Sequence, residues 1–412
     1  MRDGAARPLS YRAAPMSPEA RFDPRYPWLL AGAAAWFGAW GMQQVLVPWL
    51  VVNVLHASAT QTGIVQMATM LPTIFLLPFG GALADRVDAR WLLAGLHVAA
   101  GLAPLAIALS IPHGALSLEL LIGAALFTGL VNSFSNPSRD SLLSRVAGSD
   151  LTRAVAGVIT AQFTAQGIGM LLARNGDEIG AAAALGIQAA VVALGAVFCI
   201  RLPGKLEQAR AREPLRSEEL LAGAKFVFAS ELRPVWPLIA GVGLFFSGAY
   251  NVLFPVMVRD VYQGGVDEIS VLLFAFPAGT IFASGWLFFR GIRRKGRALA
   301  ISQAVGALTL IGCAANVPLW AAVALTFVWG LAGGIFMTTG RALFQERAPL
   351  AERARIMATH QLAMVASGPL GALLSGALGD AIGPLFATAA LGGMMLALIA
   401  GVLSLSNVWR ME

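Results

Sequence analysis

Many of the residues that could do chemistry in this chain stand at the ends of long apolar segments. The segment from Gly81 to Arg90 holds an acid, Asp85, together with Arg86 and Arg90. A carboxylate there can accept hydrogen bonds from an arginine and from the N-terminus of a nearby helix, where the helix dipole favours negative charge. We therefore predict a latch between helices, with a turn that only orients the chain as the alternative.

Three further charged residues adjoin apolar segments and extend the predicted latch. Arg139 and Asp140 stand at the end of one such segment, and Arg341 stands at the end of another. Ionisable groups next to hydrocarbon are costly, which makes them functional candidates. The alternative, that both arginines extend to the lipid headgroups, stays open.

Uncharged polar and aromatic residues inside the apolar segments are the candidates for substrate contact. Gln162 and Gln166 are four residues apart and share one helix face. Such amides either line a cavity or bond a neighbouring helix, and both interpretations stay open. The candidate cavity residues are Trp40, Gln43, Gln44, Asn132, Gln162, Gln166, Tyr250 and Asn251. Amide and aromatic groups with few charges favour a bulky amphiphilic or neutral substrate.

Other chemistries have little support in the sequence. His97 is the only titratable residue deep in an apolar segment, and it is either a proton site or a packing residue. Cys199 and Cys313 lack the spacing of a metal site, so we expect neither metal nor cofactor. The chain has no G-x-x-x-x-G-K-[ST] motif and no Ser/His/Asp set, which argues against an ATPase and against an enzyme.

The composition is that of a membrane protein. Of 412 residues, 57% are hydrophobic and 12% are charged, and the mean hydropathy is +0.72. A membrane-spanning helix needs about 20 mostly apolar residues. About twelve such runs are predicted, at 27–55, 59–81, 91–111, 117–136, 156–173, 181–200, 236–257, 269–289, 298–315, 319–339, 357–378 and 382–405.

The distribution of charge predicts the topology of the chain. If the N-terminus lies in the cytoplasm, every Lys and Arg except Arg174 and Arg259 falls on the cytoplasmic side. This bias follows the positive-inside rule, so the net charge of +7 reflects topology and not nucleic-acid binding. The predicted parts are a cytoplasmic tail (1–26), a six-helix bundle (27–200), a cytoplasmic linker with a surface helix (201–235), a second six-helix bundle (236–405) and a cytoplasmic tail (406–412).

The two predicted bundles share a repeated pattern. Gly81, Arg86 and Arg90 recur 204 positions later as Gly285, Arg290 and Arg294, while Phe289 takes the place of Asp85. Arg139, Arg145 and Arg153 likewise recur 202 positions later as Arg341, Arg347 and Arg355. Such a repeat, with six spans in each copy, predicts two parallel bundles, and only the first copy keeps the acid that a latch requires.

Small residues in two corresponding spans predict close helix packing or a hinge. Gly169 falls on Gly371 at the 202-residue shift. Glycine lets membrane helices approach closely, and a proline can bend one. The residues of this kind are Gly167, Gly169, Gly368, Pro369 and Gly371.

With these features, the chain resembles the major facilitator superfamily. That family's loop signature is G-x-x-x-D-R-x-G-R-[RK], and Gly81, Asp85, Arg86 and Arg90 fill four of its places. Asp88 and Ala89 depart from the signature. Within the superfamily, the chain is most similar to the group of enterobactin exporters and macrolide efflux proteins. The segments that carry this similarity are Pro48–Val51, Gly80–Arg90, Asn136–Arg139 and Glu219–Phe228.

The resemblance implies an all-α membrane protein with twelve transmembrane helices in two six-helix bundles. It places the partner of the latch at the helix that begins near Ile356. It also implies a monomeric, proton-coupled secondary transporter of the inner membrane that exports a drug-like or siderophore-like molecule by alternating access. Two alternatives are an importer or uniporter with the same fold, and a membrane sensor or assembly partner without transport activity.

Overall fold

The N-terminal half of the chain is a bundle of long helices joined by short turns. The computed structural model describes residues 22–148, 151–204, 217–290, 292, 294–349 and 352–411. The predicted N-terminal tail therefore lies mostly outside the described residues. The helical segments of this half are α1 (Tyr26–Trp49), η1 (Leu50–Val54), α2 (Ala59–Arg86), α3 (Ala89–Ser110), α4 (Leu118–Val146), α5 (Leu151–Ala173), α6 (Gly176–Ile179) and α7 (Ala181–Cys199).

The C-terminal half repeats this arrangement after one intervening helix, α8 (Ser217–Ala229). Residues 205–216 of the predicted linker lie outside the described part of the chain. The helical segments that follow α8 are α9 (Val235–Gly248), η2 (Ala249–Leu253), α10 (Phe254–Asp260), α11 (Val266–Arg290), α12 (Lys295–Ala314), α13 (Leu319–Arg347), α14 (Arg353–Ile382), α15 (Pro384–Leu405) and η3 (Val408–Arg410).

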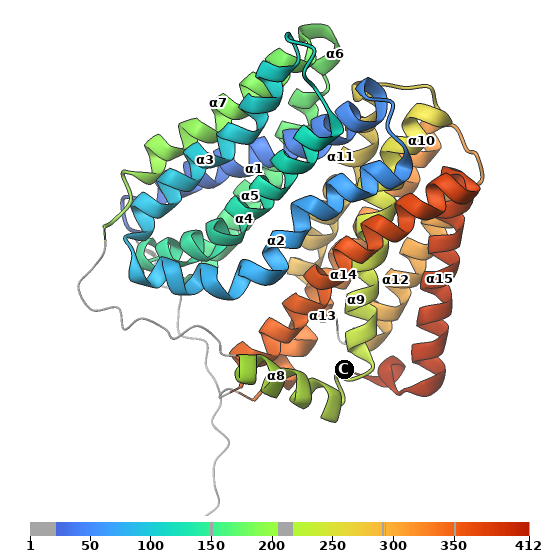
Figure 1. The fold of residues 1–412 in the computed structure, drawn as a ribbon. Helices are drawn as coiled ribbons and strands as arrows, with labels where there is room; N and C mark the ends of the chain where they lie inside the picture. Colours follow the sequence, from blue (N-terminus) through green and yellow to red (C-terminus); the bar gives the residue numbers. More distant parts are fainter. Residues whose placement is uncertain are drawn as a thin grey trace, which may run out of the picture.

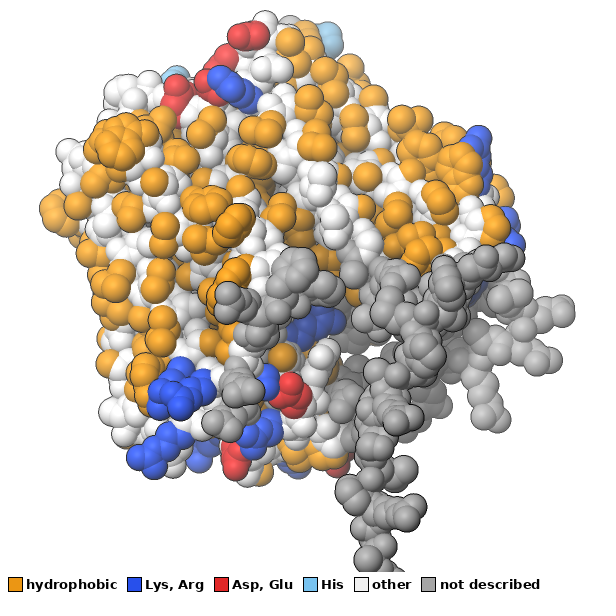
Figure 2. Space-filling view, turned by 180° about the vertical axis from the view of Figure 1, so that it is seen from behind, with side chains coloured by type: hydrophobic (Ala, Val, Ile, Leu, Met, Phe, Trp, Pro, Cys, Tyr) orange, Lys and Arg blue, Asp and Glu red, His pale blue; other side chains and the backbone are white. Residues whose placement is uncertain are grey.

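The two halves lie side by side and differ in spacing from one end to the other. Their ribbons converge at the end that carries α6 and α10 and diverge toward the end that carries α8 (Figure 1). Figure 2 shows hydrophobic side chains over the middle of one face, with Lys and Arg side chains gathered toward the α8 end. We call the α8 end the basic end and the α6–α10 end the opposite end.

The all-helical membrane fold predicted from the sequence is confirmed. Among the described residues, nine helices are long and apolar enough to cross a membrane. The segments α1–η1, α2 and α5 occupy the places of the three other predicted spans. Together these twelve segments are consistent with six spans in each half.

The predicted ends of several spans are wrong because the helices continue beyond the apolar core. Helix α4 runs ten residues past its predicted end at 136 and has 29 residues, which corresponds to a length of about 43 Å. Helix α2 runs through Arg86, so Val87 and Asp88 alone separate it from α3. Most of the segment that looked like a basic turn is therefore helical, because polar residues need not end a helix outside the hydrocarbon.

The departure from the loop signature at Asp88 has a structural role. Asp88 is the N-cap of α3, and its Oδ1 accepts a hydrogen bond of 3.0 Å from the backbone N–H of Arg90. Aspartate is one of the preferred N-cap residues because it satisfies an amide that has no partner within the helix. The aspartate thus begins the next helix directly after a two-residue turn.

Glycines bring the first helix of each half against the fifth. A Cβ at Gly169 in α5 would overlap the carbonyl oxygen of Gly38 in α1, and a Cβ at Gly371 in α14 would overlap that of Leu244 in α9. Without these side chains the helix backbones touch, which is a common packing mode in membranes. The first helix of each half is followed by a π-helical segment near the opposite end, η1 after α1 and η2 after α9.

The glycines nearest to them contact the other half of the molecule. A Cβ at Gly167 would lie 2.9 Å from the ring of Phe274 in α11, and one at Gly368 would lie 2.6 Å from the Cε of Met70 in α2. Pro369 lies inside α14 directly after Gly368. These small residues therefore allow close contact between the halves near the middle of the spans.

Candidate functional site

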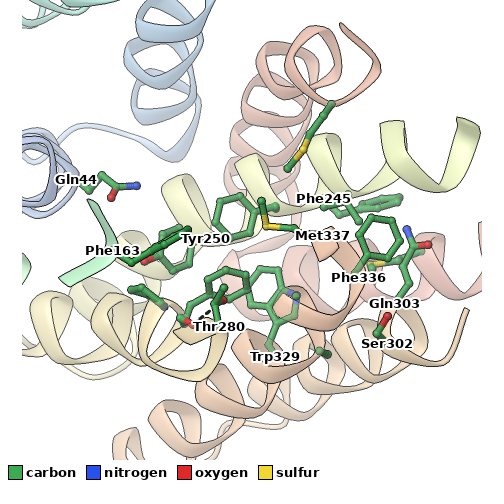
Figure 3. Close-up of a pocket in the computed structure, with 18 of the residues that line it drawn as sticks. Gln44, Phe163, Phe245, Tyr250, Thr280, Ser302, Gln303, Trp329, Phe336 and Met337 are labelled. Carbon is green, nitrogen blue, oxygen red and sulfur yellow. Dashed lines mark hydrogen bonds between the residues drawn. The ribbon is translucent and has the colours of Figure 1, made fainter. Parts of the chain in front are cut away.

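A cavity of about 180 Å³ lies between the two halves. Helices α1 and α5 contribute Gln44, Phe163 and Gln166 from the N-terminal half, and the C-terminal half supplies the remaining lining residues. The side chains from that half are mainly aromatic residues and methionines (Figure 3). They are Val242, Phe245, Phe246, Tyr250, Phe276, Pro277, Thr280, Ser302, Gln303, Trp329, Ala332, Gly333, Phe336, Met337, Met364 and Met395.

Stacked aromatic rings form one wall of this cavity. Phe246 and Tyr250 are four residues apart, and their ring centroids lie 4.7 Å apart in a stacked arrangement. Phe276 of α11 and Trp329 of α13 meet at 5.2 Å, edge to face. Such pairs hold one another in fixed orientations and offer flat apolar surfaces to a ligand. We call Phe246, Tyr250, Phe254, Phe276 and Trp329 the aromatic cluster.

The hydroxyl of Tyr250 hydrogen-bonds the protein backbone and does not donate into the cavity. It donates a hydrogen bond of 2.5 Å to the carbonyl oxygen of Leu273, and the residue is buried. The hydroxyl of Thr280 is also engaged, since it bonds the carbonyl oxygens of Phe276 and Gly330, both at 3.1 Å. The aromatic wall therefore presents ring surfaces and few free donors.

Amide groups supply most of the polar lining. Gln166 Nε2 donates to Gln44 Oε1 at 2.6 Å, which joins α5 to α1 at the cavity. In the C-terminal half, Gln303 Nε2 donates to the carbonyl oxygen of Leu238 at 3.1 Å, and its buried Oε1 has no hydrogen-bond partner. None of the described lining residues carries a charge. The cavity is thus suited to an uncharged molecule with aromatic or apolar surface and a few polar groups.

A second, smaller pocket of about 30 Å³ lies within the N-terminal half. Gln188 Nε2 donates to Gln43 Oε1 across it at 2.5 Å. Thr128 Oγ1 and Gln188 Oε1 are buried there without a hydrogen-bond partner. A polar space of this size can hold about one water molecule. It is lined by Trp36, Ala39, Trp40, Gln43, Ala100, Thr128, Val131, Asn132, Gln188 and Val192.

The candidate cavity residues predicted from the sequence thus separate into three groups. Gln44, Gln166 and Tyr250 line the large cavity. Trp40, Gln43 and Asn132 line the small pocket in the N-terminal half. Gln162 and Asn251 line neither of the two.

Arg139 lies inside the N-terminal half and does not reach toward the membrane surface. Its side chain is buried and donates to Ser135 Oγ and Asn136 Oδ1, both at 3.0 Å. The guanidinium lies 4.7 Å from the ring centroid of Phe37 and 5.5 Å from that of Trp36. Its Nε has no hydrogen-bond partner. The cation is therefore stabilised by aromatic faces and neutral oxygens.

The remaining latch residues lie at the basic end. The side chains of Asp85 and Arg86 are outside the described residues, as is the surrounding of Gly81. Arg90 forms an ion pair with Asp88 of its own half at 3.4 Å. Asp140 and Arg341 are both exposed, and the carboxylate of Asp140 interacts electrostatically with Arg139 of its own half and with Arg341 of the other half. The predicted partner helix, α14, begins at Arg353, slightly before the predicted Ile356.

His97 is fully buried between α1, α3 and α7. Its Nδ1 lies 2.8 Å from the carbonyl oxygen of Leu93, and its Nε2 lies 3.2 Å from that of Gly32. The thiol of Cys199 is 3.6 Å from Nδ1, and the Trp36 ring packs against the imidazole at 4.9 Å. Both ring nitrogens thus lie within hydrogen-bond distance of a backbone carbonyl oxygen.

Several functional candidates were missed from the sequence. The aromatic cluster combines residues from α9–η2–α10, α11 and α13, so no local spacing reveals it, although the interval of four between Phe246, Tyr250 and Phe254 indicated one shared face. His360 of α14 was also missed: it is buried, packs on Phe344 at 4.8 Å and has an Nδ1 without a hydrogen-bond partner.

The sequence matches a known transporter family. Residues 29–316 match the family model described as Major Facilitator Superfamily. The chain is 28% identical over 386 residues to the enterobactin exporter EntS of Shigella boydii serotype 18, covering 89% of this chain and 87% of that protein. The enterobactin exporter EntS of Escherichia coli O127:H6 matches with the same identity and coverage.

Solved structures agree on the fold. The nucleoside transporter NupG is similar with a TM-score of 0.74 and 17% identity, covering 92% of this chain and 98% of that chain. A POT family transporter in complex with 5-aminolevulinic acid gives a TM-score of 0.73 with 13% identity, covering 92% and 96%. The fold, the membrane-spanning helices and the matching family model point to a multi-pass transporter rather than an enzyme. The chain belongs to the Major Facilitator Superfamily.

Proposed function

We propose that this protein exports a small, uncharged or amphiphilic aromatic molecule across the inner membrane. The observation that carries the proposal is the cavity between the halves, which is lined by four of the five rings of the aromatic cluster and by amides and has no charge among its described lining residues. The similarity to enterobactin exporters supports the direction and the class of substrate, a drug-like or siderophore-like compound. In this proposal the bundles at 27–200 and 236–405 rock about the cavity as a monomer.

We place the basic end in the cytoplasm, together with both termini. The excess of Lys and Arg at this end supports this orientation through the positive-inside rule. The cavity would then load from the cytoplasm or the inner leaflet, because the halves diverge toward the basic end. When the basic end closes, Asp85 would approach the N-terminus of α14, and Asp140 would pair with Arg341.

A resistance screen tests the proposed export. The protein is expressed in a strain stripped of its own efflux pumps, and survival is measured against neutral aromatic amphiphiles, siderophores and small anions. We expect protection against the first two classes alone, with lower cellular accumulation of the protective compound. The double variant Asp85→Ala, Arg90→Ala tests the latch in the same assay, and full activity of this variant would contradict the latch.

The same screen separates the two alternative functions. Greater accumulation of a compound on expression would identify an importer or uniporter. A folded protein that moves no compound in liposomes under any imposed pH gradient would contradict transport and would favour a sensor or assembly partner.

We propose His97 as the site that couples transport to protons. Its two ring nitrogens face the carbonyl oxygens of Leu93 and Gly32, so the protonated ring can donate at both positions. The variant His97→Gln is expected to lose flux driven by a pH gradient and to retain exchange of labelled substrate at equal pH. His113→Gln, at an exposed histidine between α3 and α4, is the control and should leave gradient-driven flux unchanged. Unchanged gradient-driven flux in His97→Gln would contradict this role.

A further inference from the structure

A short sequence repeat marks the opposite end of both halves. Gly176-Asp177-Glu178-Ile179-Gly180 and Gly379-Asp380-Ala381-Ile382-Gly383 share the pattern Gly-Asp-x-Ile-Gly, 203 positions apart. The last glycine has a positive φ in both copies, 85° at Gly180 and 81° at Gly383. This backbone conformation favours glycine, and it ends the turn directly before α7 in one half and α15 in the other. The first copy is the short helix α6 and the second is the last turn of α14, and both end in the same glycine conformation. We call the two segments the Gly-Asp-x-Ile-Gly turns.

The aspartate of the second turn caps a helix of the other half. Asp380 accepts hydrogen bonds from Ser58 Oγ at 2.8 Å, from the backbone N–H of Ala59 at 2.8 Å and from that of Thr60 at 3.0 Å. These groups form the N-terminus of α2, where a carboxylate is favoured by free amides and by the helix dipole. Ser58 is already the N-cap of α2, so Asp380 adds a second cap that comes from the C-terminal half.

The aspartate of the first turn makes the corresponding contact in the reverse direction. Asp177 Oδ2 accepts a hydrogen bond of 3.3 Å from the backbone N–H of Val266, the first residue of α11. A Cβ at Gly265 would lie 2.7 Å from this oxygen, so glycine makes room for the carboxylate. Helices α2 and α11 are the second spans of their halves. Each is therefore capped by an aspartate that lies near the end of the fifth span of the other half.

Neighbouring contacts join the same turns. Arg259 of the C-terminal half donates to the carbonyl oxygens of Val52, at 3.1 Å, and Ala57, at 2.6 Å, next to the cap of α2. Arg174 pairs with Asp267 in the first turn of α11. At the basic end, by contrast, Arg90 pairs within its own half, and the ribbons diverge there (Figure 1). Among the described residues, the direct hydrogen bonds and ion pairs between the halves thus lie at the opposite end.

We propose that the two Gly-Asp-x-Ile-Gly turns form a two-fold symmetric gate that holds the opposite end closed, with Asp380 as the stronger cap and Asp177 as the weaker one. Opening this end requires both carboxylates to leave the helix N-termini of the other half. The gate rests on the proposed alternating access, but its closed state is a property of the protein without substrate. It can therefore be tested without knowing what is transported.

The distance between the halves at the opposite end tests the gate. Spin labels are placed on Ala115→Cys and Ala315→Cys, two exposed turn positions of that end, in a background with Cys199→Ala and Cys313→Ala. Pulsed electron paramagnetic resonance then measures the distance distribution in liposomes without substrate. We expect one short distance for the parent protein. Asp380→Ala should raise the ratio of long to short distances about tenfold, as expected for the loss of a helix cap.

Matched variants separate the gate from general damage. Asp177→Ala should raise the ratio by less than Asp380→Ala, and the double variant by more than either. Glu178→Ala removes the neighbouring exposed acid and should leave the distances unchanged. Asp380→Asn keeps the size of the side chain and should have an intermediate effect. Such an effect could not be attributed to misfolding of the alanine variant.

Distances in the double variant that equal those of Glu178→Ala would overturn the gate. An equal shift in all variants, Glu178→Ala included, would also overturn it, because the effect would then be unspecific. Failure of the proposed export is a separate result, since it would appear as absent flux with the gate distances still responding to Asp380→Ala.

Discussion

The two halves of this transporter present different surfaces to the space between them. The C-terminal half offers the aromatic cluster together with methionines, while the N-terminal half offers the Gln44–Gln166 amide pair and keeps a cation, Arg139, behind its first helix. The helix packing is nevertheless shared, since Gly169 and Gly371 hold equivalent helix pairs together 202 positions apart. The backbone contacts within the two halves are thus equivalent, whereas the side chains that the halves present to the cavity differ.

This difference indicates how a ligand would be divided between the halves. Flat aromatic surfaces and polarizable methionines bind apolar or aromatic groups of varied shape. Amides act through directional hydrogen bonds and discriminate between polar groups. We therefore expect the C-terminal half to supply most of the affinity and the N-terminal half to supply selectivity.

The largest expected effect comes from Trp329, because its ring contacts four others of the aromatic cluster at centroid distances between 5.2 and 6.3 Å. Trp329→Leu should reduce transport by about tenfold or more, since each aromatic contact contributes about 0.5–1.5 kcal/mol. Trp329→Phe should reduce transport less than Trp329→Leu. The measurement is the initial rate of efflux at several substrate concentrations.

Trp320 provides the control in the same helix. It belongs to α13 but is 74% exposed, against 5% for Trp329. Trp320→Leu should transport like the parent protein. Equal losses in both variants would show that the aromatic cluster has no special part in binding and would remove the main contrast between the halves.

The second prediction concerns the cation of the N-terminal half. Arg139 is buried on neutral partners, whereas its counterpart Arg341 is exposed. Burial of a cation carries a desolvation cost that hydrogen bonds to neutral groups offset only in part, and an apolar side chain at this position avoids that cost. Arg139→Leu should therefore keep or raise the melting temperature and still reduce transport several-fold if the cation acts in the transport cycle. Arg341→Leu should leave the melting temperature unchanged.

A melting temperature that falls strongly in Arg139→Leu would assign the cation a structural role. Thermal melting in detergent and efflux in liposomes together distinguish the two outcomes. Arg139→Lys sharpens the result, because lysine keeps the charge but cannot bond Ser135 and Asn136 with one planar group.

The architecture was more predictable from the sequence than the site. Apolar runs, the charge bias and the repeated glycines and arginines predicted the helical fold, because the bilayer forces these patterns on any spanning chain. The end of α2 at Arg86 was missed, because a polar residue outside the hydrocarbon need not end a helix. The predicted cavity residues were chosen among uncharged polar and aromatic residues, and this choice included Gln44, Gln166 and Tyr250 but passed over Trp329 and Phe276.

The contacts between the halves were the least predictable feature. Asp380 and Ser58 are 322 positions apart, and their pairing depends on the relative position of two bundles. The repeat of Gly-Asp-x-Ile-Gly was nevertheless visible in the sequence, and its final glycines signalled a turn with positive φ. A repeat that recurs at turns can thus indicate contacts that composition and periodicity do not.

The smallest expected effect tests the selectivity assigned to the N-terminal half. Gln166→Leu removes the donor to Gln44 and leaves an apolar surface of similar size at the cavity. A single neutral hydrogen bond contributes about 1 kcal/mol, so the preference for a polar over an apolar substrate analogue should fall about fivefold. Gln162→Leu, on the same helix but outside the cavity lining, should leave the preference unchanged. Competition between two labelled analogues measures this ratio directly, and an equal shift in both variants would contradict the division between the halves.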